Sequence, residues 1–197
     1  MNLISRKITS FLIGEYRASE SYLTKAGSEY SSFVKNKLYF NSFIEKINVP
    51  LCQDYGLYYN EGRFESLKVD KYSTPSYLSQ LPDKKYFYKP VIGHKGEGAG
   101  FFQKNDNVII INGKDESLES LEIALKNSSS NDPNGITLIS EYLCPHDDIK
   151  KLSPKALPTF RILTFQEETN EINIVHAVLR MGLGDSYIDN FSNKGLG

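Results

Sequence analysis

The residues whose types and spacing most clearly indicate a chemical role are Lys89 and the four glycines that follow it. These glycines stand at positions 93, 96, 98 and 100. Without a side chain, a glycine lets its backbone N–H approach an anion closely and turn towards it at positive φ. Lys89 alternates with Phe87 and Val91, so its ammonium shares a strand face with apolar side chains, a partly dry place that favours a bound anion. The spacing indicates a loop that handles phosphate, and a glycine-rich hairpin with a snorkelling lysine fits the same residues.

The elements that must hold this loop are two β-strands, because aromatic and β-branched residues flank the glycines on both sides. No Gly-Lys-Ser or Gly-Lys-Thr follows, which excludes a Walker loop, and no helical pattern follows, which excludes a dinucleotide fingerprint. Elsewhere the pattern predicts helices from Asn36 to Ile47 and from Asp115 to Lys126, and a short helix whose cap lies within 73–76. It also predicts strands over 108–111 and 136–143, and a hairpin formed by 159–166 and 172–181. In the second arm of that hairpin, one face is expected to carry Ile174, His176, Val178 and Arg180.

The composition is that of an ordinary soluble globular protein of 197 residues, with 40% hydrophobic and 24% charged residues and a net charge of −1. This balance gives no basic field, so nucleic acid is excluded as a partner. Cys52 and Cys144 lack metal-type spacing, which favours a reducing, cytoplasmic setting. The N-terminal apolar run, residues 11–13, is too short for a signal-peptide core or a membrane-spanning helix.

Two segments of the C-terminal half carry the motifs of a known family. Residues 141–146, Glu-Tyr-Leu-Cys-Pro-His, are followed by residues 152–164, Leu-Ser-Pro-Lys-Ala-Leu-Pro-Thr-Phe-Arg-Ile-Leu-Thr. Together with Arg180 and the glycine two residues later, this pattern resembles the sugar-transfer-associated branch of the ATP-grasp superfamily, which is related to α-L-glutamate ligases. Residues 189–197 resemble the family's aspartate-asparagine step before a paired-glycine turn, except that Leu196 separates the two glycines.

The resemblance implies an α+β ATP-grasp fold, with two lobes of mostly antiparallel sheet and helices around a nucleotide cleft. Three parts are expected along the chain. They are an N-terminal helical segment, 1–35, an ATP-grasp lobe with the glycine-rich loop, 36–143, and the start of a truncated second lobe, 144–197. The C-terminal part of the fold, which carries the family's magnesium ligands, is expected beyond Gly197.

The resemblance also implies which residues bind ATP. Lys37 and Lys89 match the two family lysines that neutralise the α- and β-phosphates. Gly96 and Gly98 belong to the loop that covers the γ-phosphate with backbone N–H groups. The hinge that bonds and lines the adenine consists of Glu141, Tyr142 and Leu143. The alternatives for the ribose are His146, Asp147 and Asp148.

For the chemical step the resemblance implies Arg161, Arg180 and Asn190. The two arginines would hold the γ-phosphoryl group and the acceptor carboxylate through their guanidinium forks, with Asn190 close to the transferring group. Two solvated cross-strand arginines are the alternative that an isolated hairpin offers. His176 shares the face of Arg180 and is either a pocket residue or a partly buried structural histidine.

The implied activity is that of an ATP-dependent carboxylate–amine ligase, in which ATP phosphorylates a carboxylate and an amine attacks the acyl-phosphate. ATP and Mg²⁺ are the expected cofactors, and the carboxylate and the nucleophile are unknown. The implied setting is cell-surface polysaccharide or peptide modification, in association with glycan-synthesis proteins. A phosphotransferase acting on a sugar or alcohol, and a non-catalytic nucleotide-binding or scaffold module, are the alternatives. No metal ligand is predicted within the chain, so poor turnover is expected of the chain alone.

Overall fold

The computed structural model describes residues 33–67, 77–93, 96–106, 108–166, 171–182 and 195–196. The chain divides into two compact units, residues 1–51 and residues 52–197. The predicted N-terminal helical segment lies almost wholly outside the described residues, as do Asn190 and the predicted cap at 73–76. The part boundaries predicted after residues 35 and 143 stay predictions.

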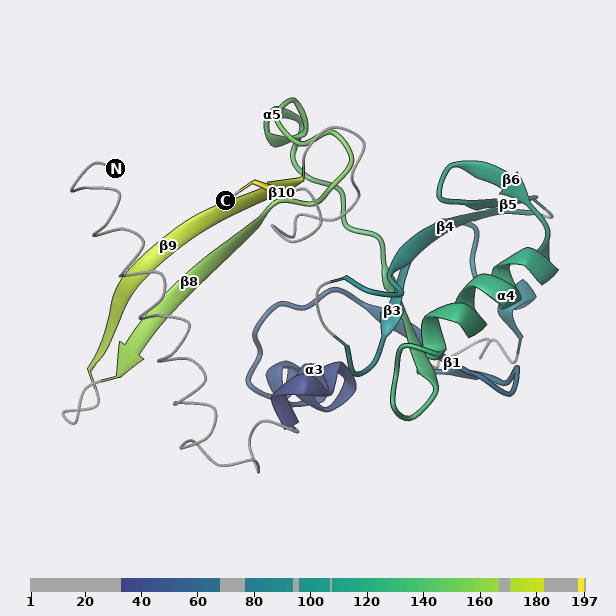
Figure 1. Ribbon diagram of the computed structural model, residues 1–197, viewed down its shortest axis with the longest axis horizontal. Coiled ribbons are helices and arrows are strands. Elements are labelled where there is room, and N and C mark those ends of the chain that lie inside the picture. Colours follow the sequence, from purple (N-terminus) through teal and green to yellow (C-terminus); the bar gives the residue numbers. More distant parts are fainter. Residues whose placement is uncertain are drawn as a thin grey trace, which may run out of the picture. The chain divides into compact units, whose positions relative to one another are not determined.

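The described chain consists mostly of strands, with a few helices between them. In order they are α3 (Lys37–Lys46), β1 (Asp54–Tyr59), β2 (Phe64–Ser66), the 3₁₀-helix η1 (Leu78–Gln80), β3 (Lys85–Pro90), β4 (Gly100–Asn105), β5 (Val108–Ile111), β6 (Lys114–Glu116), α4 (Leu118–Ser129), β7 (Ile136–Glu141), α5 (Asp147–Lys150), β8 (Thr159–Gln166), β9 (Ile172–Gly182) and β10 (Gly195–Leu196) (Figure 1). Every pairing between these strands is antiparallel. This mixed α+β architecture, with antiparallel sheets and few helices, confirms the predicted fold class.

The first unit contributes helix α3 to the described structure. Asn36 caps its N-terminus, because the side-chain oxygen accepts hydrogen bonds from the backbone N–H groups of Leu38 and Tyr39, both at 3.1 Å. The helix ends at Lys46, and Asn48 follows with φ at +57°, a conformation that asparagine tolerates. Both ends of the helix therefore follow from local sequence, and the predicted helix is confirmed.

The second unit is built on a seven-stranded sheet with the strand order β2-β1-β7-β3-β4-β5-β6. Strand β3 alternates along its length as the sequence predicts. Tyr86 and Tyr88 are buried, while Phe87 and Lys89 are half-buried on the opposite face. Strands β1 and β7 lie on one side of β3 and strand β4 on the other, so β3 is a central strand.

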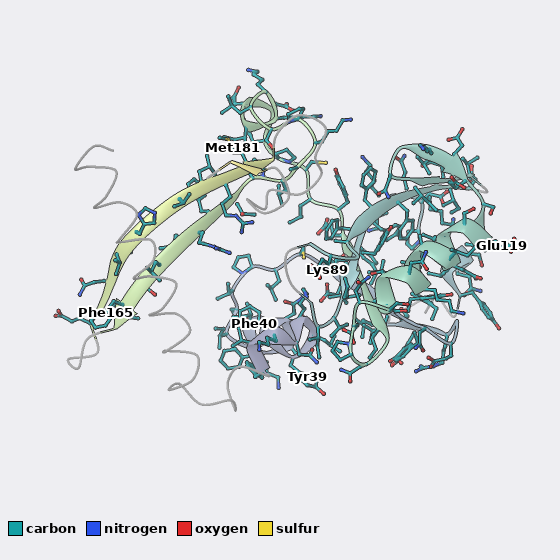
Figure 2. All side chains as sticks on the ribbon, in the orientation of Figure 1. Tyr39, Phe40, Lys89, Glu119, Phe165 and Met181 are labelled. Atoms are coloured by element: carbon teal, nitrogen blue, oxygen red, sulfur yellow. The ribbon has the colours of Figure 1, made fainter. Side chains whose placement is uncertain are left out.

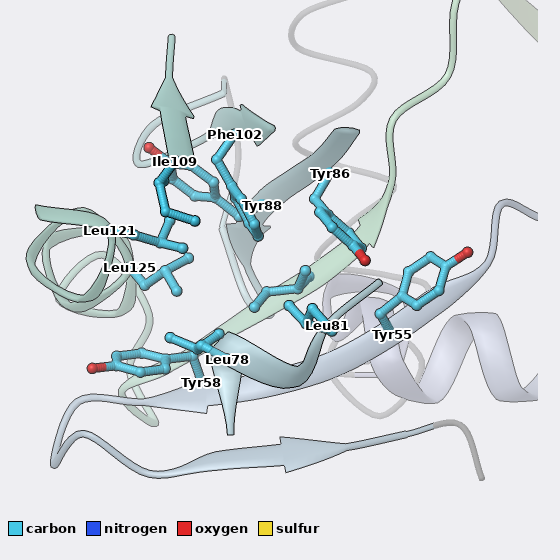
Figure 3. Packing of buried hydrophobic residues seen from close by; sticks show 11 residues of the cluster. Tyr55, Tyr58, Leu78, Leu81, Tyr86, Tyr88, Phe102, Ile109, Leu121 and Leu125 are labelled. Atoms are coloured by element: carbon cyan, nitrogen blue, oxygen red, sulfur yellow. The ribbon is translucent and has the colours of Figure 1, made fainter. Parts of the chain in front are cut away.

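Helix α4 covers the face of the sheet that carries Tyr86 and Tyr88. Leu121 and Leu125 of α4 are directed at the aromatic side chains of the sheet (Figure 3). Tyr86 and Phe102 are both 0% exposed, and their rings stack with centroids 4.9 Å apart. Aromatic packing of this kind holds the central strands and α4 as one layered body. The opposite face of β3 carries Lys89.

The predicted bounds of the second helix and of the 136–143 strand are wrong. The helix runs from Leu118 to Ser129 and not from Asp115 to Lys126, because residues 114–116 pair with β5 as strand β6 and Ser117 caps the helix. The Ser117 hydroxyl accepts from the backbone N–H of Ser120 at 3.1 Å. Strand β7 ends at Glu141, two residues before the predicted end, so Tyr142 and Leu143 follow the strand and are not part of it.

The second sheet has the strand order β10-β9-β8, and its main part is the β8–β9 hairpin. Arg161 pairs with Val178, and Thr159 pairs with Arg180. The register shifts between Leu163 and Thr164, which leaves Val175 as an extra residue in β9. Beyond this bulge Ile174 pairs with Thr164, on the face opposite to His176, so the prediction that Ile174 shares the face of His176 and Arg180 is wrong.

Candidate functional site

Lys89 projects from β3 on the side of the sheet away from α4 (Figure 2). Across the sheet it lies in one row with Leu138 of β7 and Leu57 of β1, which are 0% and 4% exposed. The Lys89 side chain is itself half-buried. Among the described residues it makes no ion pair within 4.0 Å. A half-buried ammonium on an apolar row favours an anion that neutralises it.

The Cys52 thiol lies within electrostatic reach of three ionisable groups, Lys89, Asp54 and Glu141. Burial raises the pKa of the half-buried Cys52 thiol, while Lys89 acts to lower that pKa and Asp54 and Glu141 act to raise it. The carboxylate of Asp54 also accepts a hydrogen bond from the Ser140 hydroxyl at 2.8 Å. One cation and two anions therefore lie within electrostatic reach of the Cys52 thiol.

The predicted hinge begins where β7 ends. The backbone N–H of Glu141 donates to the carbonyl of Gln53 at 2.7 Å, and the Glu141 carboxylate accepts from the Gln53 N–H at 3.4 Å. These two contacts fasten Glu141 to the chain segment before β1. The N–H of Glu141 is consequently engaged within the protein and is not a donor to a ligand edge.

Tyr142 forms an aromatic cluster with the neighbouring strands. Its ring lies 5.4 Å from the ring of Phe101, measured between centroids. The ammonium of Lys85 stands 4.5 Å from the Tyr142 ring centroid and 4.9 Å from that of Phe101. Such cation–π contacts hold Lys85 over the rings. Leu143, in contrast, is exposed.

The described part of the glycine loop is a tight turn. Gly96 and Gly98 have φ angles of +75° and +69°, and the N–H of Ala99 donates to the carbonyl of Gly96 at 3.2 Å. A Cβ added at Gly98 would lie 2.8 Å from Nδ2 of Asn131 and 3.2 Å from the Ser128 carbonyl oxygen. Both reasons for glycine, positive φ and close approach, therefore apply at Gly98, and the close approach is to the end of α4.

Two of the residues implied by the resemblance lie outside this cluster. Lys37 is half-buried on α3 in the first unit, where the structure describes it separately from Lys89. His146 is exposed and caps α5, since its Nδ1 accepts from the backbone N–H of Asp148 at 3.3 Å. Neither position tests the phosphate or ribose role, and both roles stay predictions.

The two arginines share one face of the β8–β9 hairpin. Arg161 pairs with Val178, and Arg180 pairs with Thr159. Thr159 and Arg161 are two residues apart along β8, so the two pairs are successive rows on the same face and the arginines are diagonal neighbours. Arg161 is exposed and Arg180 is half-buried. Cross-strand diagonal neighbours are typically about 7–8 Å apart, a spacing at which two guanidinium groups can reach one anion. Asn190 lies outside the described residues.

No group of three or more His, Cys, Asp or Glu side chains that could hold a metal ion occurs within the described ranges. In the same part of the chain, no helix combines the length and apolar character that crossing a membrane requires.

Sequence reasoning missed five residues that surround Lys89 or the hinge. They are Cys52, Asp54, Lys85, Phe87 and Phe101. The sequence placed Phe87 on the face of Lys89 but did not assign it to the site. Lys85 and Phe87 have the same parity as Lys89 along β3, so strand periodicity could have found them. Cys52 and Asp54 reach the site only through the pairing of β1 with β7, which joins Asp54 to Ser140. No local signal in the sequence contains that pairing.

Comparisons with known proteins agree with the resemblance. A family model described as sugar-transfer associated ATP-grasp matches residues 17–197. No curated protein and no solved structure matches the chain. Proteins of the ATP-grasp type bind ATP, generally with Mg²⁺, and have ATP-dependent, ligase-like functions in general. The predicted family is thereby confirmed.

Proposed function

Because this chain belongs to the sugar-transfer-associated ATP-grasp family, we propose that the Lys89 face of its seven-stranded sheet binds the phosphates of ATP. One observation carries the proposal. Lys89, whose half-buried ammonium has no ion pair among the described residues, lies near the end of the aromatic strand β3 and precedes a turn with two glycines at positive φ. A lysine on a dry face neutralises phosphate charge, and backbone N–H groups in such a turn donate hydrogen bonds to phosphate oxygens.

Lys89 neutralises the α- and β-phosphates, and the glycine turn at 96–98 donates backbone N–H groups to the γ-phosphate. Lys37 keeps the role of the other phosphate-contacting lysine, which rests on the family resemblance. Asp54 and Glu141 are acceptors only and repel phosphate oxygens. Both act on Cys52, as Lys89 does, so the phosphates are expected to lie away from these two carboxylates.

The adenine base lies against the hinge. Since the Glu141 N–H is already bonded to Gln53, main-chain groups after Glu141 supply the hydrogen bonds to the base edge. Tyr142 and Leu143 line the slot, as the resemblance implies, and Phe87 adds an aromatic side chain from the same face as Lys89. His146 is the ribose-binding residue in this arrangement.

The reaction is the ligation of a carboxylate to an amine. An oxygen of the acceptor carboxylate attacks the γ-phosphorus, the bond to the β-phosphate oxygen breaks, and ADP leaves. The amine nitrogen then attacks the acyl carbon, phosphate departs with the electrons of the C–O bond, and the amine proton passes to solvent. Arg161 and Arg180 hold the acceptor carboxylate and the phosphoryl group, with Asn190 beside them.

Magnesium accompanies ATP in this family, and its charge stabilises the phosphates during transfer. The residues described contain no acidic cluster that fits the ion, so we assign it no protein ligand among them. The setting is the modification of cell-surface polysaccharide or peptide with glycan-synthesis proteins as partners. The cytoplasm supplies the ATP, and it suits the free thiols of Cys52 and Cys144.

Titration calorimetry with ATP and Mg²⁺ tests the phosphate site. Lys89→Met keeps the apolar stem and removes the charge, and it should weaken ATP binding by at least about tenfold, since a hydrogen bond to a charged group contributes about 1.5–3 kcal/mol. Lys114→Met, at an exposed lysine of β6, is the matched control and should bind ATP like the wild type. Equal ATP affinity for Lys89→Met and the wild type would remove Lys89 from the site.

Trapping with hydroxylamine tests the reaction class. A ligase incubated with ATP and its carboxylate substrate releases a hydroxamate, because hydroxylamine attacks the acyl-phosphate in place of the amine. A phosphotransferase acting on a sugar or alcohol forms a phosphate ester and gives no hydroxamate. A panel of amino acids and uronic acids is the appropriate starting set, and ADP formation without hydroxamate would overturn the ligase assignment.

A further inference from the structure

Two parts of the glycine loop rest on the same short segment, residues 128–132 at the end of α4. The backbone N–H of Ile92, at the start of the loop, donates to Oδ2 of Asp132 at 2.5 Å. Gly98, in the described turn, approaches the same segment so closely that an added Cβ would lie 2.8 Å from Nδ2 of Asn131 and 3.2 Å from the Ser128 carbonyl oxygen. The position of the loop is therefore coupled to the end of α4 at both places.

Asp132 is the only ionisable side chain in that segment, and its surroundings fix it tightly. The residue is 6% exposed, and its second oxygen, Oδ1, accepts from the backbone N–H of Asn134 at 2.6 Å. A buried carboxylate is costly unless its oxygens are hydrogen-bonded, so both bonds are strongly favoured. One oxygen thus closes the turn after α4, and the other holds the start of the glycine loop.

Helix α4 is in turn fixed to the sheet. Leu121 and Leu125 are buried in the core, and the Thr137 hydroxyl donates to the carbonyl of Leu125 at 3.0 Å. Thr137 belongs to β7, the strand that ends at Glu141. The core, α4 and the turn after it therefore form a rigid support for the Asp132 carboxylate.

From this geometry we infer that Asp132 is a positioning residue for the glycine loop. It fixes the Ile92 end of the loop so that the N–H groups of the turn at 96–98 meet the terminal phosphates of ATP at a set place. Asp132 itself does not touch the nucleotide. The inference rests on the proposed ATP site, and it adds to that site a residue that neither the family match nor the sequence pattern identifies.

The substitution Asp132→Asn should remove the hydrogen bond from the Ile92 N–H and keep the one from the Asn134 N–H. The amide oxygen retains the bond from the Asn134 N–H, an Asx turn that asparagine forms well. The amide nitrogen then faces the Ile92 N–H, and two donors cannot bond. Asp132→Ser is a second variant with the same logic, since a serine hydroxyl keeps the turn but does not reach Ile92. Asp115→Asn, at an exposed acid of β6, is the matched control for charge.

Amide hydrogen exchange of the nucleotide-free chain tests the first half of the inference. In Asp132→Asn the amides of Ile92 and of residues 96–100 should exchange at least about tenfold faster than in wild type, because loss of one hydrogen bond to a charged group has that effect. The α4 amides of Leu121 and Leu125 should keep their rates, as should the whole Asp115→Asn control. Unchanged exchange at Ile92 and 96–100 in both Asp132 variants would overturn the inference.

Affinity for ATP relative to AMP tests the second half. AMP lacks the phosphates that the turn meets, so Asp132→Asn should weaken ATP binding about tenfold and leave AMP binding unchanged. Faster loop exchange with an unchanged ratio of ATP to AMP affinity would overturn the positioning role. A wild type that binds ATP no better than AMP would instead overturn the proposed function, and the exchange experiment would still decide whether Asp132 holds the loop.

Discussion

The seven-stranded sheet and the β8–β9 hairpin are both antiparallel, yet they bury their apolar side chains to very different extents. Tyr86 and Phe102 of the sheet are 0% exposed, whereas Phe160 and Ile174 of the hairpin are 74% and 68% exposed. Packing against α4 gives the sheet a core of its own, and within the described residues the hairpin has backbone pairing without such a core. The difference separates the candidate site into a part held by packing, around Lys89, and a part held by strand pairing, around Arg161 and Arg180.

The largest expected effect contrasts the two regions directly. Phe102→Ala should lower the free energy of unfolding by about 3–5 kcal/mol, because it opens a cavity in the core and removes the ring stacked on Tyr86. Phe160→Ala should change it by less than about 0.5 kcal/mol, since the side chain is mostly exposed. Urea unfolding followed by circular dichroism measures both. Equal losses would show that the hairpin has a packed core of its own.

A smaller effect is expected at the glycine turn, where the packed region meets the proposed phosphate site. Gly98→Ala should lower the free energy of unfolding by about 1–3 kcal/mol, because alanine is strained at φ +69° and its Cβ meets Asn131. Gly113→Ala is the matched control: its φ is +87°, but no atom lies within 4 Å of an added Cβ.

Both glycine variants should therefore show backbone strain in urea unfolding, and only Gly98→Ala should also weaken ATP binding in calorimetry. Weakened ATP binding in Gly113→Ala, or full ATP affinity in Gly98→Ala, would contradict the placement of the phosphates at the 96–98 turn.

The smallest effect concerns the two thiols. Burial raises the pKa of Cys52, so less of its reactive thiolate is present at any given pH, and iodoacetamide should alkylate Cys52 several-fold more slowly than the exposed Cys144. ATP should slow the reaction of Cys52 further and leave Cys144 unchanged, because Cys52 lies within electrostatic reach of Lys89. Mass spectrometry of the two peptides against time measures both rates.

The raised pKa of Cys52 also makes the free energy of unfolding depend on pH. A thiol whose pKa is higher in the folded chain than in the unfolded chain stabilises the fold below the unfolded pKa, and this contribution disappears as the pH rises through the folded pKa. Cys52→Ser should therefore flatten the loss of stability at alkaline pH. A wild type and a Cys52→Ser variant with the same alkaline slope would contradict the raised pKa.

Local sequence determined the parts of the site that depend on one strand or one turn. The alternation of β3 placed Lys89 and Phe87 on one face, and glycine at 96 and 98 indicated the left-handed turn. Pairing between distant strands decided the rest. The bulge in β9 moved Ile174 to the other face, and β6 moved the start of the predicted helix from Asp115 to Leu118. The β1–β7 pairing brought Cys52 within electrostatic reach of Lys89 and Asp54. The roles of Lys37, His146 and the arginines rest on the family match and stay proposals.

Photo-crosslinking with 8-azido-ATP, followed by peptide mapping, tests most directly whether the packed region holds the nucleotide. We expect saturable labelling, displaced by excess ATP, on β3 or on residues 138–143, next to Lys89 and the hinge. The label should disappear in Lys89→Met and persist in Lys114→Met. Saturable labelling confined to α4, on the face of the sheet opposite to Lys89, or to the edge strand β6 would contradict the proposed site, as would the same labelling of the hinge in Lys89→Met.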